Sequence, residues 1–73
     1  MNRIDVESSV VRAIGYEPAT SRLEVAFVNG GVYRYHHVPA AVHAAFLAAE
    51  SKGQFLNGVV KPNYPVAQVG PWG

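Results

Sequence analysis

The sequence predicts a small α+β domain: a three-stranded antiparallel meander with one helix packed on one face and an irregular C-terminal tail. Apolar side chains alternate with others over residues 23–28 and 32–36, the period of half-buried strands. The pair Asn29-Gly30 between these segments is typical of a hairpin turn. A helical pattern of apolar residues follows, and a length of 73 residues allows one domain, residues 1–73, and no more.

The composition excludes several classes of site. Hydrophobic residues make up 49% of the chain and charged residues 15%, with a formal net charge of +1. This charge is too small to indicate a nucleic-acid or membrane partner by itself. The absence of cysteine excludes disulfides and thiolate metal sites. The N-terminus has no apolar run typical of a signal peptide, and no segment approaches membrane-spanning length. We therefore expect a soluble, cytoplasmic protein with no membrane partner.

The first predicted strand covers residues 10–16, which are rich in β-branched side chains. Ile14 and Tyr16 share one face of this strand, and Val11 joins them only if a β-bulge intervenes. Residues 17–21 have the composition of a turn that leads to the next strand.

The hairpin between the second and third strands is predicted by counting residues. A loop of residues 29–31 pairs Phe27 with Tyr33 and places the large apolar side chains of both strands on one face. A two-residue loop would instead mix apolar and charged side chains on that face. In the three-residue loop we expect Gly31 to take the left-handed conformation.

A helix is predicted from about Pro39 to Ser51, with Gly53 closing it. The apolar stripe toward the sheet consists of Val38, Val42, Ala45, Phe46 and Ala49. The opposite side is also apolar where a solvated helix would carry charges. This candidate interaction face consists of Ala40, Ala44, Leu47 and Ala48.

Both ends of the chain lack a clear pattern. Residues 1–7 are polar and expected to be loose. Residues 54–65 are expected to be irregular because their prolines prevent a long helix. Whether a fourth strand forms near Val66–Val69 is left open by the sequence.

The sequence predicts no catalytic, cofactor or metal site. His36 and His37 are adjacent on a strand, so they point to opposite faces and cannot both bind one ion. His43 stands alone on the helix. No serine belongs to a motif that would place it beside a histidine and a carboxylate. We therefore expect a protein that is not an enzyme.

The chain resembles the KTSC domain over about residues 6–65. The motifs that carry the resemblance are Ser8-Ser9, Ile14-Gly15-Tyr16, Leu23-x-Val25-x-Phe27, Gly30-Gly31-x-Tyr33-x-Tyr35-x-x-Val38-Pro39, Ser51-x-Gly53-x-Phe55-x-Asn57 and Val60-Lys61-x-x-Tyr64. This domain occurs at the carboxyl end of some lysyl-tRNA synthetases and as a stand-alone bacterial protein. The family has an unknown function, with RNA binding as a suggestion. Lys61-Pro62 departs from the pattern, in which a polar residue more often follows the basic one.

The resemblance and the aromatic residues together give the predicted function, a non-catalytic binding module for RNA. Tyr16, Phe27, Tyr33 and Tyr35 form either a base-stacking platform or the core under the helix, and both alternatives stay open. The candidate RNA-binding residues are Tyr33, Arg34, Tyr35, Asn57, Lys61 and Arg12. The alternative function is a protein-interaction module or small homo-oligomer that uses the candidate interaction face.

Overall fold

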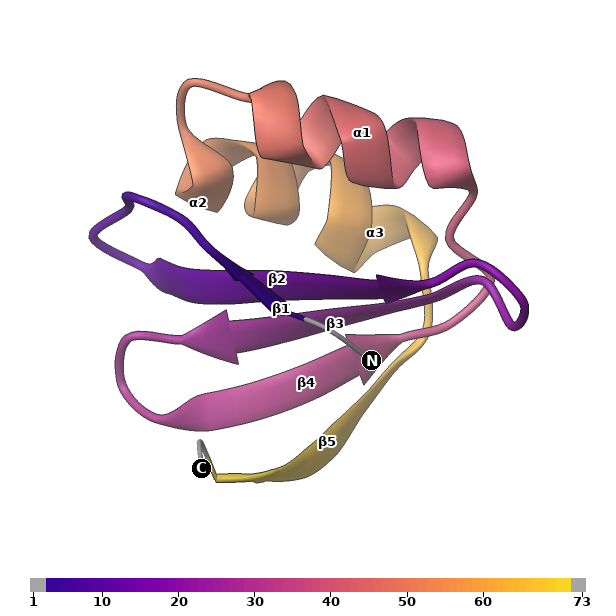
Figure 1. The fold of residues 1–73 in the computed structure, drawn as a ribbon, viewed down its shortest axis with the longest axis horizontal. Helices are drawn as coiled ribbons and strands as arrows, with labels where there is room; N and C mark the ends of the chain where they lie inside the picture. The colour runs from indigo at the N-terminus through magenta and orange to yellow at the C-terminus, as the bar shows by residue number, and fades with distance from the viewer. Residues whose placement is uncertain (1–2, 72–73) are drawn as a thin grey trace.

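The computed structural model describes residues 3–71 and shows one antiparallel sheet with helices on one side (Figure 1). The sheet has five strands in chain order: β1 Arg3–Asp5, β2 Val11–Glu17, β3 Arg22–Phe27, β4 Gly31–Tyr35 and β5 Val66–Pro71. The helical segments are α1 Ala40–Ala48, α2 Lys52–Phe55, the π-helical η1 Leu56–Val60 and α3 Lys61–Asn63. None of the helices in this described range is long and apolar enough to cross a membrane.

The α+β class is confirmed, but the prediction of three strands is wrong. The predicted meander is β2–β4, and one further strand pairs at each of its edges. Ile4 of β1 pairs with Ile14, and Val66 of β5 pairs with Tyr35. β1 has three residues, which are too few to show an alternating pattern. β5 depends on pairing with β4, which lies about thirty residues earlier in the chain.

The β3–β4 hairpin has a loop of the predicted length at a different place. Val25 pairs with Tyr33, so the register differs by two residues from the predicted one. The N–H of Gly30 donates to the carbonyl of Phe27 (2.9 Å), and Gly30 has a φ of +99°. The loop is therefore residues 28–30, and the left-handed residue is Gly30 rather than Gly31. A shift of two residues preserves the faces, so the predicted apolar face is nevertheless present.

The β-bulge on which the position of Val11 depends is present in β2. The register shifts between Val11 and Ala13, so Val11 pairs with Phe27 while Ile14 pairs with Val25. This extra residue brings Val11 to the face that Ile14 occupies, as predicted for a strand with a β-bulge.

The helical part is longer and more broken than predicted. α1 ends at Ala48, because Ala49 already has extended backbone angles. Ser51 then caps the N-terminus of α2, and its Oγ accepts the N–H of Gln54. The tail expected to be irregular forms α2, η1 and α3. Pro62 is the second residue of α3, directly after the π-helical η1, and the helical backbone continues through it.

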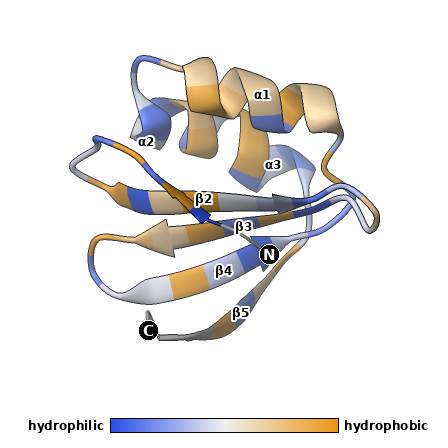
Figure 2. Ribbon diagram, in the orientation of Figure 1, coloured by the Kyte–Doolittle hydropathy of each residue, from blue (hydrophilic) through white to orange (hydrophobic). Residues whose placement is uncertain are grey.

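The main core lies between the sheet and the helices. It consists of Val11, Ile14, Leu23, Val25, Phe27, Tyr35, Val38, Phe46, Leu56 and Val60. Of the predicted helix stripe, Val38 and Phe46 are fully buried, whereas Ala45 is exposed. Leu47 packs partly against the core instead. α1 contains no charged residue, its exposed residues are all alanines, and most of its ribbon has the colours of hydrophobic residues (Figure 2).

Candidate functional site

The alternation of β4 divides the predicted RNA-binding residues between the two faces of the sheet. Tyr35 lies in the core beneath the helices and is 2% exposed. Tyr33 points to the same side and packs against that core. Arg34, between them, points to the other face, where it lies opposite Glu24. Successive side chains of a strand alternate in this way, so the three residues cannot form one surface.

An open groove lies on the helix side, between the β3–β4 hairpin, β5 and the beginning of α3. Its volume is about 490 Å³. The lining residues are Val10, Phe27, Asn29, Tyr33, Tyr35, Lys61 and Val66. Val10 and Val66 are 45% and 50% exposed, so the rim is apolar and open to solvent. Among these lining residues, Lys61 is the one that carries a charge.

The floor of the groove is aromatic. The Tyr33 and Phe27 rings meet edge to face, with centroids 5.3 Å apart and an interplanar angle of 83°. The Nζ of Lys61 lies 6.0 Å from the centroid of the Phe27 ring. This distance is at the limit of a cation–π contact, worth about 0.5–1 kcal/mol at exposed sites. Tyr33 is half-buried and Lys61 is exposed, so a ring and an ammonium are both accessible from one groove.

Tyr35 contributes to the floor as a core residue. Burial raises the pKa of its hydroxyl, and the neighbouring Tyr33 raises that pKa further. Tyr35 therefore stays neutral over the physiological range. Tyr16 is also tied into the fold: its hydroxyl donates to the carbonyl of Val38 (2.6 Å), and its ring stacks on His43 with centroids 4.6 Å apart. Burial lowers the pKa of His43.

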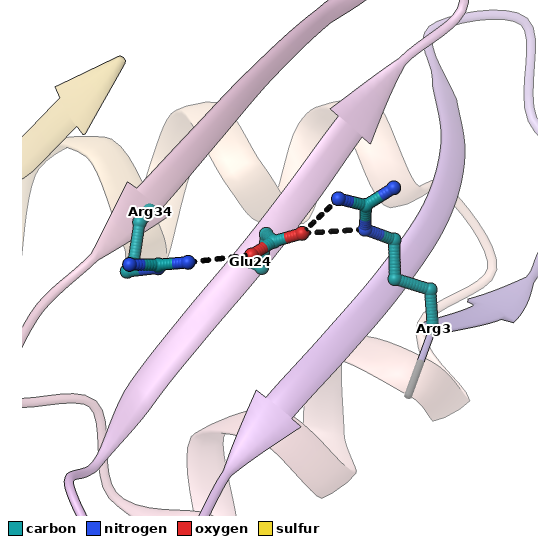
Figure 3. A network of polar contacts seen from close by, with 3 residues as sticks. All are labelled: Arg3, Glu24 and Arg34. Atoms are coloured by element: carbon teal, nitrogen blue, oxygen red, sulfur yellow. Dashed lines mark hydrogen bonds and ion pairs between the residues drawn. The ribbon is translucent and has the colours of Figure 1, made fainter. Parts of the chain in front are cut away.

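The opposite face of the sheet carries a charge network centred on Glu24 (Figure 3). Arg34 donates from Nη2 to Oε2 of Glu24 (3.1 Å), and Arg3 donates to Oε1. Gly15 lies between Arg3 and Glu24 in the register and has no side chain, which leaves the path between them open. Arg34 Nε is buried without an acceptor among the described residues, so the ion pair is made through Nη2.

This network sets the charge state of Glu24, which is 3% exposed. Burial alone would raise the pKa of the carboxyl. The hydrogen bonds from Arg34 and Arg3, together with their charges, outweigh burial and hold that pKa below its ordinary value. Glu24 is therefore ionised at neutral pH, and the network joins β1, β3 and β4 across the outer face.

Comparison with known proteins identifies the fold. The sequence pattern of the KTSC domain matches residues 7–64. The chain belongs to the KTSC domain family. The crystal structure of a KTSC domain protein from Yersinia pestis is 39% identical, with a TM-score of 0.91, and the match covers 94% of this chain and 97% of that one.

Two sequence relatives show the settings in which this KTSC domain type occurs. A protein of Tsukamurella paurometabola is 49% identical over 59 residues, which are 81% of this chain and 88% of that protein. A lysine–tRNA ligase of Nostoc sp. is 35% identical over 63 residues, which are 86% of this chain but 11% of the ligase. The KTSC domain is thus similar both to a nearly whole small protein and to a short segment of a large enzyme.

The remaining predicted site residues of this KTSC domain do not line the groove. Asn57 is exposed on η1, and Arg12 is exposed at the bulge of β2. Within the described part of the chain, no three histidine or acidic side chains gather as they would around a metal ion. A smaller polar cleft of about 180 Å³ lies between residues 7–10 and 50–53.

Three lining residues, Val10, Asn29 and Val66, were not singled out as candidates from the sequence. Asn29 carried a usable signal, because a polar turn residue beside two aromatic strands is well placed to contact a ligand. Val66 joins the groove only because β5 pairs with β4, and Val10 only because the loop after β1 packs at the hairpin.

Proposed function

We propose that this KTSC domain is a non-catalytic module that binds single-stranded RNA. One base stacks on Tyr33 in the groove, and an adjacent phosphate contacts Lys61. The observation that supports this proposal is that a half-buried aromatic ring and an exposed ammonium line the same open groove. Proteins that bind single strands combine these two elements, because every base has a stacking face and every phosphate a charge.

The geometry limits the affinity. One accessible ring stacks one base, and stacking contributes about 1–3 kcal/mol per base. One cation in the groove implies a shallow dependence on salt, with a slope of about −0.7 per phosphate contact. We therefore expect micromolar or weaker binding to short RNA.

The relatives support an RNA ligand. The lysine–tRNA ligase of Nostoc sp. is named for an enzyme that acts on tRNA, and it contains a segment similar to this chain. A weak, sequence-tolerant module attached to such an enzyme would raise the local concentration of RNA. The same physical role is open to a stand-alone copy that acts beside another RNA-binding protein.

A fluorescence-anisotropy titration with short single-stranded RNA at two salt concentrations tests the proposal. Lys61→Ala should weaken binding and flatten the salt slope while lowering the melting temperature only slightly. Arg22→Ala is the matched control, because Arg22 is exposed at the other end of β3 and its loss removes the same charge. Equal effects of the two substitutions would reject a contact between Lys61 and phosphate. No binding at low salt with protein at hundreds of micromolar would reject RNA as the ligand.

Self-association is the second candidate function, and it is favoured by α1. Ala40, Ala44 and Ala48 are exposed on a helix that contains no charged residue, so two copies would not repel each other. Leu47 is half-buried against the core and is therefore a poor place for a test substitution. Ala44→Glu should abolish any concentration-dependent mass in light scattering while preserving the fold. A monodisperse monomer of the natural chain at high concentration would remove this candidate.

A further inference from the structure

We infer that a second copy of this chain pairs with the free edge of β5, in an antiparallel register centred on Ala67. This surface is separate from the groove and from the outer side of α1, and the inference does not depend on RNA binding. β5 is the last strand of the sheet, and β4 is its one neighbour within residues 3–71 (Figure 1). Its other edge is therefore open to a further strand.

The pairing of β4 with β5 determines which backbone groups of β5 face this edge. The N–H of His36 donates to the carbonyl of Pro65 (2.9 Å), so the two residues form a hydrogen-bonded pair. Bonded and non-bonded pairs alternate along an antiparallel ladder. Ala67 is therefore bonded to β4, whereas Val66 and Gln68 are at non-bonded positions. The N–H and C=O groups of Val66 and Gln68 point to the free edge.

These outward groups are complementary to the same groups of a second copy related by a two-fold axis. When Ala67 lies opposite Ala67 of the second copy, Val66 lies opposite Gln68 of the second copy. Each of the two equivalent pairs then forms two hydrogen bonds, and every outward N–H and C=O of residues 66–68 has a partner. Residues opposite each other at a non-bonded pair approach to about 4.5 Å between Cα atoms, and the small side chain of alanine fits there. Pro65 falls at the next non-bonded pair, where its missing N–H is not needed.

The side chains at this edge permit such pairing. Residues 64–70 include no charged side chain, and Val66 and Val69 are 50% and 44% exposed. The opposite edge of the sheet is different, because β1 has three residues and two of them, Arg3 and Asp5, carry charges. Short, charged strands prevent pairing between sheet edges. β5 is therefore the edge that a second copy can use.

The contact is short, so the dimer should be weak. The register of β5 shifts after Gln68, which leaves Val69 unpaired with β4 and limits the regular ladder to residues 66–68. We expect a dissociation constant of about 0.1–1 mM. Directly paired residues share a face, so the grooves of both copies, each bordered by Val66, open on the same side of the joined sheet.

Sedimentation equilibrium at up to about 2 mM protein, above the expected dissociation constant, measures the association. Gln68→Pro removes an N–H that β4 does not use, so the melting temperature should fall only slightly. The dissociation constant should rise by at least about tenfold, because this N–H is used twice in the dimer. Ala67→Lys keeps every backbone group but places two ammonium groups opposite each other, so it should also weaken the dimer. Ala44→Glu, which adds a charge on α1, is the control and should associate as the natural chain does.

Amide hydrogen exchange locates the contact by residue. As the protein concentration rises, protection should increase at Val66 and Gln68 and change less at Ala67, which β4 already protects. A natural chain that stays monomeric at about 2 mM would overturn the inference. A dimer that persists in folded Gln68→Pro and Ala67→Lys but is lost in Ala44→Glu would also overturn it, because α1 would then be the contact surface.

Discussion

Arg34 lies opposite Glu24 on neighbouring strands and donates to its carboxylate over 3.1 Å, on the sheet face that the helices do not cover. The same strand presents Tyr33 to the groove on the other face. A guanidinium held in this way stabilises the sheet and is directed away from any ligand in the groove. Substitutions can therefore change ligand binding in the groove and the stability that comes from the charge network independently.

Replacing Arg34 should affect stability rather than binding. Arg34→Ala removes one of the two arginines on Glu24 and should lower the free energy of unfolding by about 1–2 kcal/mol. The value is modest because the Arg34 side chain is 31% exposed. Urea unfolding gives the stability, and the anisotropy titration gives the salt slope, which should stay unchanged. A weaker salt dependence of RNA binding with unchanged stability would indicate instead that Arg34 contacts the RNA.

Glu24 should make the stability of the domain depend on acid pH. Its folded-state pKa lies below the ordinary value of 4.5, so the ionised carboxylate stabilises the fold above that pH. This contribution is lost as the pH falls below 4.5 through the folded-state pKa. Urea unfolding of the natural chain and of Glu24→Gln, at neutral and acid pH, measures the difference. The difference in free energy of unfolding between the two proteins should become smaller at acid pH. A difference that stays constant with pH would show that ionised Glu24 does not stabilise the fold.

The hairpin shows what strand patterns determine and what they do not. Alternation of Leu23, Val25 and Phe27 correctly predicts which face of the strand joins the main core, since any even shift of register preserves that face. The pattern alone does not distinguish pairing of Tyr33 with Val25 from pairing with Phe27. The turn decides, because Asn29 binds Gly31 through its side chain and leaves Gly30 as the left-handed residue.

Three glycine substitutions test this turn. Gly30→Ala should destabilise by about 1–2 kcal/mol, because a φ of +99° strains any residue with a Cβ atom. Gly31→Ala should cost less, since its Cβ would lie 3.1 Å from Cε1 of Tyr33, a ring edge that can shift. Gly58→Ala, with open space around it in η1, should be neutral or stabilising. Thermal unfolding ranks the three variants by their loss of stability. A larger loss at Gly31 than at Gly30 would indicate that Gly31 is the left-handed residue, as the sequence predicts.

The site was predictable only in part, for a physical reason. Tyr33 and Lys61 carry clear signals of a ring and a charge, and the structure brings both to one groove. The sequence also predicts that Arg34 binds RNA beside them, but the period of the strand turns Arg34 to the other face of the sheet. Val66 could not be assigned, because its place depends on a pairing with Tyr35 across the helical segments.

The ring of Tyr33, rather than its hydroxyl, should carry most of the binding. Tyr33→Phe retains the stacking surface and should bind RNA nearly as well as the natural chain. Tyr33→Leu keeps an apolar side chain but loses the aromatic face, so affinity should fall by about 1–3 kcal/mol. Melting temperatures of both variants control for the contact with Phe27. Equal affinities of the two folded variants would exclude stacking on this residue.

NMR can locate RNA on the protein and so tests whether it lies in the groove on the helix side of β4. Short oligouridine is titrated into the ¹⁵N-labelled protein, and the amide shifts are followed by residue. We expect the largest shifts at Gly30, Tyr33, Lys61 and Val66. Shifts centred instead on Gly15, Glu24 and Ala67 would place the RNA on the arginine face and contradict binding in the groove.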